Sequence, residues 1–260
     1  MKKVGVIGLG DMGSGLAKNL LKNGFATIGF DLSADRIKAF TKMGGHAASN
    51  PREVGKNADA VFVMVMDGDQ VKDVILGGNG LRSSLKRGSV IILTATIRTV
   101  EARDLGAALE GSGIHLIDSP VSGGFPRAQS GTLTLMASGS AEVLDEFSEV
   151  MQAVSKTIHR VGTEPGMGQT VKACLQSLQG SIFSATFEAS ALAAKAGVMR
   201  LTECLAQEWA PFGIRVNAIL PAQELTPALE KMFQEPRFRE TRDRFLGGIP
   251  LGRLMEPVDF

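Results

Sequence analysis

The segment VGVIGLGDMG, residues 4–13, decides how the rest of this 260-residue sequence is interpreted. Its first four residues are a mostly β-branched apolar run, which predicts a buried strand. Gly8, Gly10 and Gly13 follow with the spacing G-x-G-x-x-G, where an apolar helical pattern begins. We expect Gly8 to make the tight bend, Gly10 to let a pyrophosphate approach the backbone, and Gly13 to bring the helix close to the strand.

An acidic residue stands where a dinucleotide site would need one. After a second apolar run, residues 26–30, Asp31 lies 18 residues beyond Gly13 (31 minus 13). A carboxylate there accepts hydrogen bonds from both hydroxyls of an adenine ribose. It would repel a 2′-phosphate, and the next basic residue is Arg36. The pattern therefore predicts NAD as cofactor in preference to NADP, while a glycine turn without a ligand would have the same spacing.

Other residues near this turn are expected to contact the same cofactor. The phosphates would lie at the helix N-terminus, where free N–H groups and the helix dipole favour negative charge. A third apolar run over 60–66 ends in the same region of a parallel sheet. The additional cofactor-binding candidates are Leu9, Asp11, Met12, Met64 and Val65.

Strand and helix patterns alternate through the first part of the chain. The expected strands are 4–8, 26–30, 60–66, 89–94, 114–118, 133–138 and 157–161, and the expected helices are 13–23, 33–43, 69–76, 99–110 and 141–153. Parallel neighbours need crossover connections, and these are right-handed. The alternation therefore predicts an α/β fold with a Rossmann-type doubly wound sheet.

The pattern changes in the second part of the chain. Apolar residues at helical spacing predict one long helix over 164–212. Residues 213–260 return to a short α/β pattern, with a strand over 214–220 and helices over 225–234 and 236–246. We expect a dinucleotide-binding domain over 1–163, then the long helix, then this tail.

Composition excludes several classes of partner. A formal charge of +1 gives no basic field for nucleic acid or an anionic membrane. The strongest apolar run is far shorter than the roughly 18 to 20 residues of a membrane span, so we expect a cytoplasmic protein without a signal peptide. Cys174 and Cys204 have no metal-ligand or disulfide spacing, so we expect two buried free thiols and no metal site.

Four segments in fixed order point to a known family. They are VGVIGLGDMGSGLAKNLLKNG (4–24), TATI (94–97), DSPVSGG (118–124) and GMGQTVKACLQ (166–176). Together they resemble the β-hydroxyacid dehydrogenases, which include 3-hydroxyisobutyrate, tartronate-semialdehyde and threonate dehydrogenases. The resemblance covers residues 1 to about 198.

The resemblance implies roles for particular residues. Ser122, Gly123 and Gly124 would hold the carboxylate of a small hydroxy acid, Thr96 would lie beside the nicotinamide, and Lys172 would transfer the proton. The chemistry is consistent with these residue types. A lysine with a pKa lowered by partial burial can take up the alcohol proton in one direction and return it in the other.

One departure from the family pattern concerns the substrate. Many members carry asparagine three and four residues after the catalytic lysine, whereas this chain has Leu175 and Gln176. We expect Gln176 in the substrate site. The threonate-type branch also departs here, which favours a polyhydroxy acid over hydroxyisobutyrate.

Beyond Gly197 the chain resembles a second family. LTECLAQEWAPFGIRVNAILPAQELTPAL (201–229) and IPLGRLMEPVDF (249–260) are similar to the C-terminal third of a short-chain dehydrogenase. Its catalytic tyrosine would stand four residues before Lys195, where this chain has Ala191, and the sequence contains no tyrosine. We therefore interpret the chain as a chimera whose tail adds no second active site.

Three functions remain open from the sequence. The first is an NAD-dependent oxidoreductase of a small hydroxy acid, the second a non-catalytic dinucleotide-binding chimera, and the third a short-chain dehydrogenase without its tyrosine. We expect a homo-oligomer, because a strand such as IRVNAIL needs a neighbouring strand. The identity of the acid and the direction of the reaction do not follow from the sequence.

Overall fold

The computed structural model describes residues 2–212, 215 and 243. The chain divides into two units, Met1–Gly180 and Ser181–Phe260. One helix, α9 (Met167–Trp209), includes the boundary between them. The strand expected over 214–220 and the helices expected over 225–246 lie outside the described residues, apart from positions 215 and 243.

The first unit contains a nine-stranded sheet. Its strands are β1 Val4–Ile7, β2 Thr27–Phe30, β3 His46–Ala47, β4 Ala60–Val63, β5 Val90–Leu93, β6 His115–Asp118, β7 Val121–Ser122, β8 Leu133–Ser138 and β9 Ser155–Gly162. The strand order is β3-β2-β1-β4-β5-β6-β8-β7, and β9 pairs with β8. Neighbours from β3 to β6 are parallel, and β8 is antiparallel to both β6 and β7. The expected doubly wound Rossmann-type sheet is confirmed.

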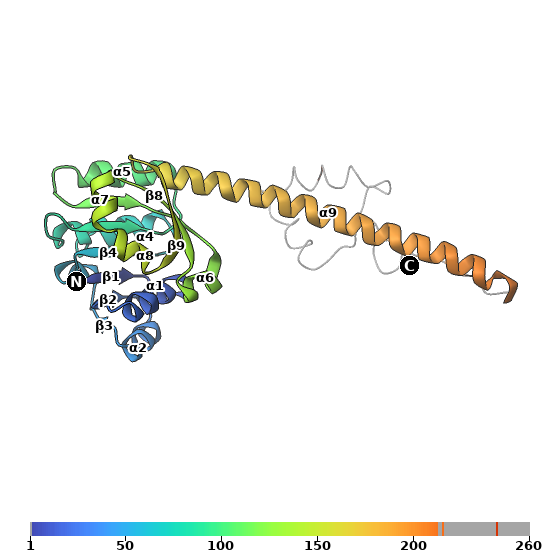
Figure 1. Ribbon diagram of the computed structural model, residues 1–260, viewed down its shortest axis with the longest axis horizontal. Helices are drawn as coiled ribbons and strands as arrows, with labels where there is room; N and C mark the ends of the chain where they lie inside the picture. The colour runs from blue at the N-terminus through green and yellow to red at the C-terminus, as the bar shows by residue number, and fades with distance from the viewer. Residues whose placement is uncertain (1, 213–214, 216–242, 244–260) are drawn as a thin grey trace. The chain divides into compact units, whose positions relative to one another are not determined.

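Helices cover both faces of this sheet (Figure 1). They are α1 Asp11–Lys22, α2 Ala34–Lys42, α3 Pro51–Lys56, α4 Gly68–Leu76, α5 Thr99–Leu109, α6 Gly124–Ser130, α7 Ala141–Glu146 and α8 Ser148–Gln152, with short 3-10 helices at Leu81–Ser83 and Ala210–Phe212. The single helix expected over 141–153 is divided into α7 and α8 at Phe147. The buried ring of Phe147 belongs to the core.

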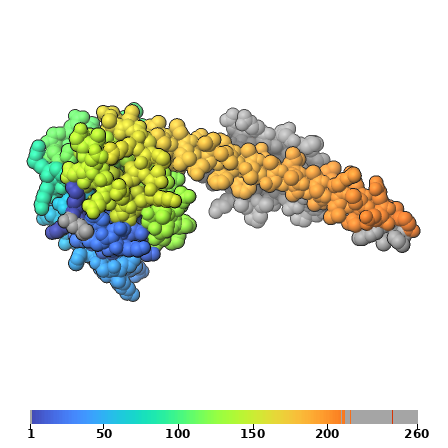
Figure 2. All heavy atoms as spheres, in the orientation of Figure 1, coloured from blue at the N-terminus to red at the C-terminus, as the bar shows by residue number. Residues whose placement is uncertain are grey.

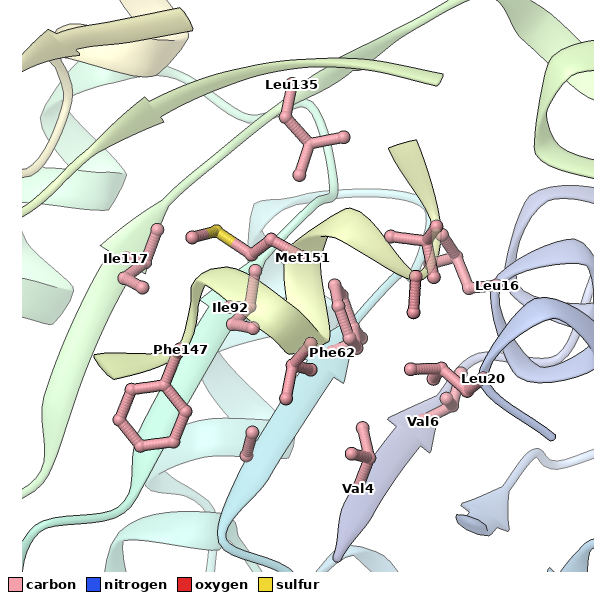
Figure 3. Close-up of a cluster of buried hydrophobic side chains, with 14 of the residues drawn as sticks. Val4, Val6, Leu16, Leu20, Phe62, Ile92, Ile117, Leu135, Phe147 and Met151 are labelled. Carbon is pink, nitrogen blue, oxygen red and sulfur yellow. The ribbon is translucent and has the colours of Figure 1, made fainter. Parts of the chain in front are cut away.

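Two apolar clusters form the core, one on each face of the sheet. On one face, Leu16 and Leu20 of α1 lie near Val4 and Val6 of β1 (Figure 3), and Phe147 belongs to the same cluster. The other cluster joins the opposite face to α3, α4 and α5. Full burial of a side chain of this size contributes about 1.5 to 3 kcal/mol. On the face presented in Figure 2, the blue to yellow-green atoms of the first unit close over this core.

The order of the strands determines where a ligand can bind. β1 pairs with β2 on one side and with β4 on the other, so the strand order reverses between β1 and β4. Ligands of open α/β sheets bind at the carboxyl ends of the strands that flank such a switch point. The glycine turn follows β1 directly and therefore lies at this position.

The helix α9 is buried at its first turn and exposed further along. Gly168 and Gln169 are buried, whereas Cys174 and Cys204 are exposed. The expectation of two buried thiols was therefore wrong, because these turns of α9 are exposed. Lys195 is exposed as well. Among the described helices, none combines the length and apolar character needed to cross a membrane.

Candidate functional site

The glycine turn is packed tightly at two positions and open at a third. Gly8 has φ +88°, and a Cβ there would overlap the carbonyl of Met64. A Cβ on Gly13 would overlap the carbonyl of Gly8. At Gly10 the nearest atom to an added Cβ is the Arg36 guanidinium carbon, 3.6 Å away. The turn thus uses two glycines for packing and leaves the backbone at the third accessible to a ligand.

Asp31 is fixed between the glycine turn and the end of β2. Its Oδ2 accepts a hydrogen bond from the Leu9 N–H at 2.7 Å, and its Oδ1 accepts one from the Ser33 N–H at 2.8 Å. The Arg36 guanidinium lies 3.4 Å from Oδ2. Oδ2 thus has two donors, whereas Oδ1 has only one described donor and keeps a further lone pair. The carboxylate is therefore oriented and able to accept additional hydrogen bonds.

Two apolar side chains in the segments that follow β2 and β4 are exposed. Leu32 follows Asp31 and is 94% exposed, and Met66 follows Val65 and is 83% exposed. Apolar surface at a strand end is suited to the flat face of a base. The sequence patterns did not single out either residue, although both lie at or just beyond the ends of predicted strand runs.

The ends of β4 and β5 are joined by backbone hydrogen bonds. The Met64 N–H donates to Ile7 O at 2.9 Å, and the N–H groups of Thr94 and Ala95 both donate to Val63 O at 3.0 Å. Thr96 follows and is exposed. The expected cofactor residues of these two strands therefore lie at the same edge of the sheet as the glycine turn.

The segment Ser122-Gly123-Gly124 leads into α6, a helix that packs against α1. Gly123 has φ +127° and Gly124 has φ +63°, a region that favours glycine. The Asn19 side chain of α1 donates to Ala128 O of α6 at 2.9 Å. The helices that follow the expected phosphate-binding and carboxylate-binding segments are thus packed against each other.

Lys172 lies beside the same segment. Its Nζ donates a hydrogen bond to Val121 O at 2.8 Å, and Val121 directly precedes Ser122. The side chain is half-buried, and desolvation by this burial lowers the pKa of Lys172. Gln176 lies one helical turn further along α9 and is exposed. A lysine with a lowered pKa beside a glycine-rich backbone segment can exchange a proton with a bound alcohol.

Asp118 anchors the start of α9. It is fully buried at the end of β6, and its Oδ2 accepts hydrogen bonds from the N–H groups of Gly166 at 2.9 Å and Gln169 at 3.1 Å. Burial raises the pKa of Asp118, and these hydrogen bonds oppose that shift. Asp118 therefore binds the backbone of the loop and of the first turn of α9. Within the described part of the chain, no three His, Cys, Asp or Glu side chains gather in a metal-binding arrangement.

Two family models match the chain. The NAD binding domain of 6-phosphogluconate dehydrogenase matches residues 3–162, and enoyl-(acyl carrier protein) reductase matches residues 129–260. They overlap over 129–162, where β8 and β9 continue the sheet of the first unit. The second match includes the segment expected to resemble a short-chain dehydrogenase.

Individual relatives are hydroxy acid dehydrogenases. An L-threonate dehydrogenase of Escherichia coli is 38% identical over 196 residues, which are 75% of this chain and 65% of that protein. The mitochondrial 3-hydroxyisobutyrate dehydrogenase of Mus musculus is 34% identical over 195 residues, 75% of this chain and 58% of that protein. The crystal structure of 3-hydroxyisobutyrate dehydrogenase from Salmonella typhimurium matches with a TM-score of 0.70 at 34% identity, covering 80% of this chain and 73% of that one. This chain therefore spans less than two thirds of the length of these two curated relatives.

Proposed function

This chain belongs to the β-hydroxyacid dehydrogenase family through its NAD-binding domain, and from this premise we propose that it is an NAD-dependent oxidoreductase of a small hydroxy acid. Its C-terminal part belongs to the enoyl-(acyl carrier protein) reductase family. The observation that carries the proposal is the hydrogen bond from Lys172 Nζ to Val121 O. It supports an amine held beside the segment expected to bind the substrate carboxylate.

The NAD-binding residues fit the cofactor that the family uses. The backbone at Gly10 is accessible, and no described side chain caps α1 there, so first-turn N–H groups are available to a diphosphate. Asp31 is oriented to accept hydrogen bonds from the ribose hydroxyls. When bound, NAD supplies the acceptor for the hydrogen that leaves the alcohol carbon with its electron pair.

The protein's own residues are proposed to bind the acid and move the proton. Backbone N–H groups of Ser122, Gly123 and Gly124 hold the substrate carboxylate, which orients the alcohol toward Lys172. In oxidation, the neutral amine of Lys172 takes the hydroxyl proton as the carbonyl forms. In reduction, the ammonium returns that proton to the oxygen. Burial favours the neutral form of the amine and so makes it a better base at a given pH than an exposed lysine.

The substrate is proposed to be threonate-like or hydroxyisobutyrate-like. L-Threonate and 3-hydroxyisobutyrate dehydrogenases are both among the relatives. Gln176 stands one turn beyond Lys172, where many family members carry asparagine, and its longer carboxamide suits an acid with additional hydroxyls. This favours the threonate-like substrate.

The test is a substrate panel with paired lysine variants. Purified protein with NAD is assayed on C3 to C5 hydroxy acids, including L-threonate and 3-hydroxyisobutyrate. Lys172→Met is expected to lower kcat by about 10² to 10⁴-fold, the range of a lost acid–base group. Lys195→Met, on an exposed turn of the same helix, is the matched control and should not change kcat. Equal turnover by Lys172→Met and the parent chain contradicts the assignment.

A second candidate function is dinucleotide binding without turnover. The L-threonate dehydrogenase relative extends beyond the matched region by about a third of its length. In a cleft that stays open, water remains in the site and weakens its electrostatic interactions. Saturable enhancement of NADH fluorescence without turnover on any acid of the panel would favour this function.

The proposed function also involves the domain organisation of the chain. We propose the division into residues 1–163, 164–212 and 213–260, with Lys172 supplied to the first domain by the long helix. The two free, exposed thiols suit a reducing compartment such as the cytoplasm.

We also propose that copies of the chain associate through α9. Its apolar residues Leu178, Ile182, Phe183, Phe187 and Leu192 are each more than half exposed. Exposed apolar patches are commonly interaction surfaces. Sedimentation velocity is expected to give a dimer or larger species, and a monomer at all concentrations contradicts this proposal.

A further inference from the structure

We propose that Gln169 is a positioning residue that fixes Lys172 relative to the loop 94–97, which is expected beside the nicotinamide. The inference rests on the proposed function. It depends on a network of hydrogen bonds that joins the ends of β5 and β6 to the first turns of α9.

The Gln169 carboxamide bridges the loop and the sheet. Its Nε2 donates to Ala95 O at 3.0 Å and to Asp118 Oδ1 at 2.8 Å, and its Oε1 accepts from the Ile97 N–H at 3.1 Å. The residue is only 2% exposed. Both amide protons and the carbonyl oxygen are therefore used.

The partners also fix the orientation of this amide. If the group were rotated by 180°, its NH₂ would face the Ile97 N–H, and its oxygen would face Ala95 O and the Asp118 carboxylate. Donors would then face donors, and acceptors would face acceptors. A carboxylate or an apolar side chain of similar size cannot satisfy all three neighbours at neutral pH.

The same network fixes the helix that carries the lysine. Asp118 Oδ2 accepts hydrogen bonds from the N–H groups of Gly166 and Gln169, so the start of α9 is attached to β6. Lys172 lies three residues after Gln169, which places the two side chains on one face of the helix. A shift of this turn against the loop therefore moves the lysine amine relative to Thr96.

Small displacements matter in such a site. A misplacement of about 1 Å can cost roughly 10²-fold in rate, because the reacting groups no longer meet in line. The glycine turn and Asp31 lie at the ends of β1 and β2, and they make no described hydrogen bond with Gln169. Loss of the Gln169 network should therefore affect kcat much more than NAD binding.

The first experiment compares Gln169→Leu with Gln179→Leu in the full chain. Gln179 is an exposed glutamine on the same helix and serves as the matched control. Gln169→Leu is expected to lower kcat by about 10 to 100-fold and to change KM for NAD by less than about threefold. The control should leave both values unchanged. Unchanged kcat in Gln169→Leu, or an equal loss of kcat and NAD affinity, overturns the inference.

The second experiment uses Gln169→Glu, which preserves shape but places a carboxyl next to Asp118. At low pH, one proton shared by the two carboxyls allows the new group to donate to Asp118 and to accept from Ile97. As the pH rises, that proton is lost and the like charges repel. We therefore expect kcat of the variant, divided by kcat of the parent chain, to be at least about tenfold higher at pH 6 than at pH 8. A ratio that does not depend on pH contradicts the positioning role, because a purely steric defect would not respond to protonation.

A third measurement separates this inference from the proposed function. If the parent chain oxidises no hydroxy acid, the proposed function fails, but the network can still be tested in the free protein. Gln169→Leu should speed hydrogen exchange of the Ile97 amide and change the acetic anhydride labelling of Lys172 relative to Lys195 by about threefold or more. Gln179→Leu should change neither. Exchange and labelling equal to the parent chain overturn the inference, whatever the turnover.

Discussion

At the scale of single residues, the most direct consequence of burial falls on Lys172. Desolvation lowers its pKa, so more of the amine is neutral at a given pH than for an exposed lysine, with its pKa of about 10.4. For oxidation, kcat/KM should rise with pH through a midpoint below that value, because the neutral amine is the base. For reduction, kcat/KM should fall through the same range, because the ammonium is the acid. Initial rates between pH 6 and 10.5 check both, and a flat profile contradicts the assignment.

Asp31 provides a second residue-scale prediction, on cofactor choice. Its carboxylate is oriented by the Leu9 and Ser33 N–H groups. Replacing it by alanine would remove the charged hydrogen bonds that we propose it makes to the ribose, each worth about 1.5 to 3 kcal/mol. Asp31→Ala should therefore weaken NAD binding by roughly tenfold or more and reduce the preference for NAD over NADP. Thermal-shift titrations with both dinucleotides test this. Stronger stabilisation of the parent chain by NADP than by NAD would show that Asp31 was misinterpreted.

Residue patterns predicted part of the site and missed part of it. Gly8, Gly13 and Asp31 could be identified from the sequence, because their expected roles depend on fixed spacing within one βαβ unit. Gln169 was not identified as a positioning residue, because its partners Ala95, in the loop after β5, and Asp118, at the end of β6, lie far away in the sequence. Only the fold brings those strands together, so local patterns could not reveal the network.

At the scale of elements, the start of α1 packs closely against the turn that follows β1. A Cβ on Gly13 would overlap the Gly8 carbonyl. Gly13→Ala should therefore lower the free energy of unfolding by about 2 kcal/mol or more and weaken NAD binding, because the helix must move away from the turn. Gly78→Ala is the control, since a Cβ at Gly78 meets nothing within 4 Å. Urea unfolding measures both variants, and equal stabilities would contradict this account of the packing.

Two features of the helices were not predicted from the sequence: the short helix α3 and the division between α7 and α8. The long periodic segments were predicted correctly as α1, α2 and α5 to within a few residues. The six-residue helix α3 was missed because it depends on its cap: the Asn50 side chain accepts from the Glu53 N–H, and Pro51 opens the first turn. The division between α7 and α8 was missed because Phe147 fits the apolar spacing of one helix. Its burial in the core is a tertiary effect.

At the scale of the whole molecule, both core clusters and all the hydrogen bonds of the candidate site belong to the unit Met1–Gly180. A chain truncated after Gly180 should therefore still unfold cooperatively and bind NAD within about threefold of the full chain. Isothermal titration calorimetry and thermal unfolding of the truncated chain measure this. Loss of NAD binding with the fold intact would mean that residues beyond Gly180 take part in the site.

The pairing of β1 with β4 has a consequence for synthesis on the ribosome. β1 emerges before β2 and β4, the two strands with which it pairs. The Gly8 bend is packed against the Met64 carbonyl, which emerges some fifty-six residues later (64 minus 8). Until then the nascent glycine bend lacks its packing partner and is open to chaperones. We expect slow translation once β4 has emerged to allow the Gly8 bend to pack against the Met64 carbonyl. The later strands would then add to a sheet in which β1 and β4 are already paired.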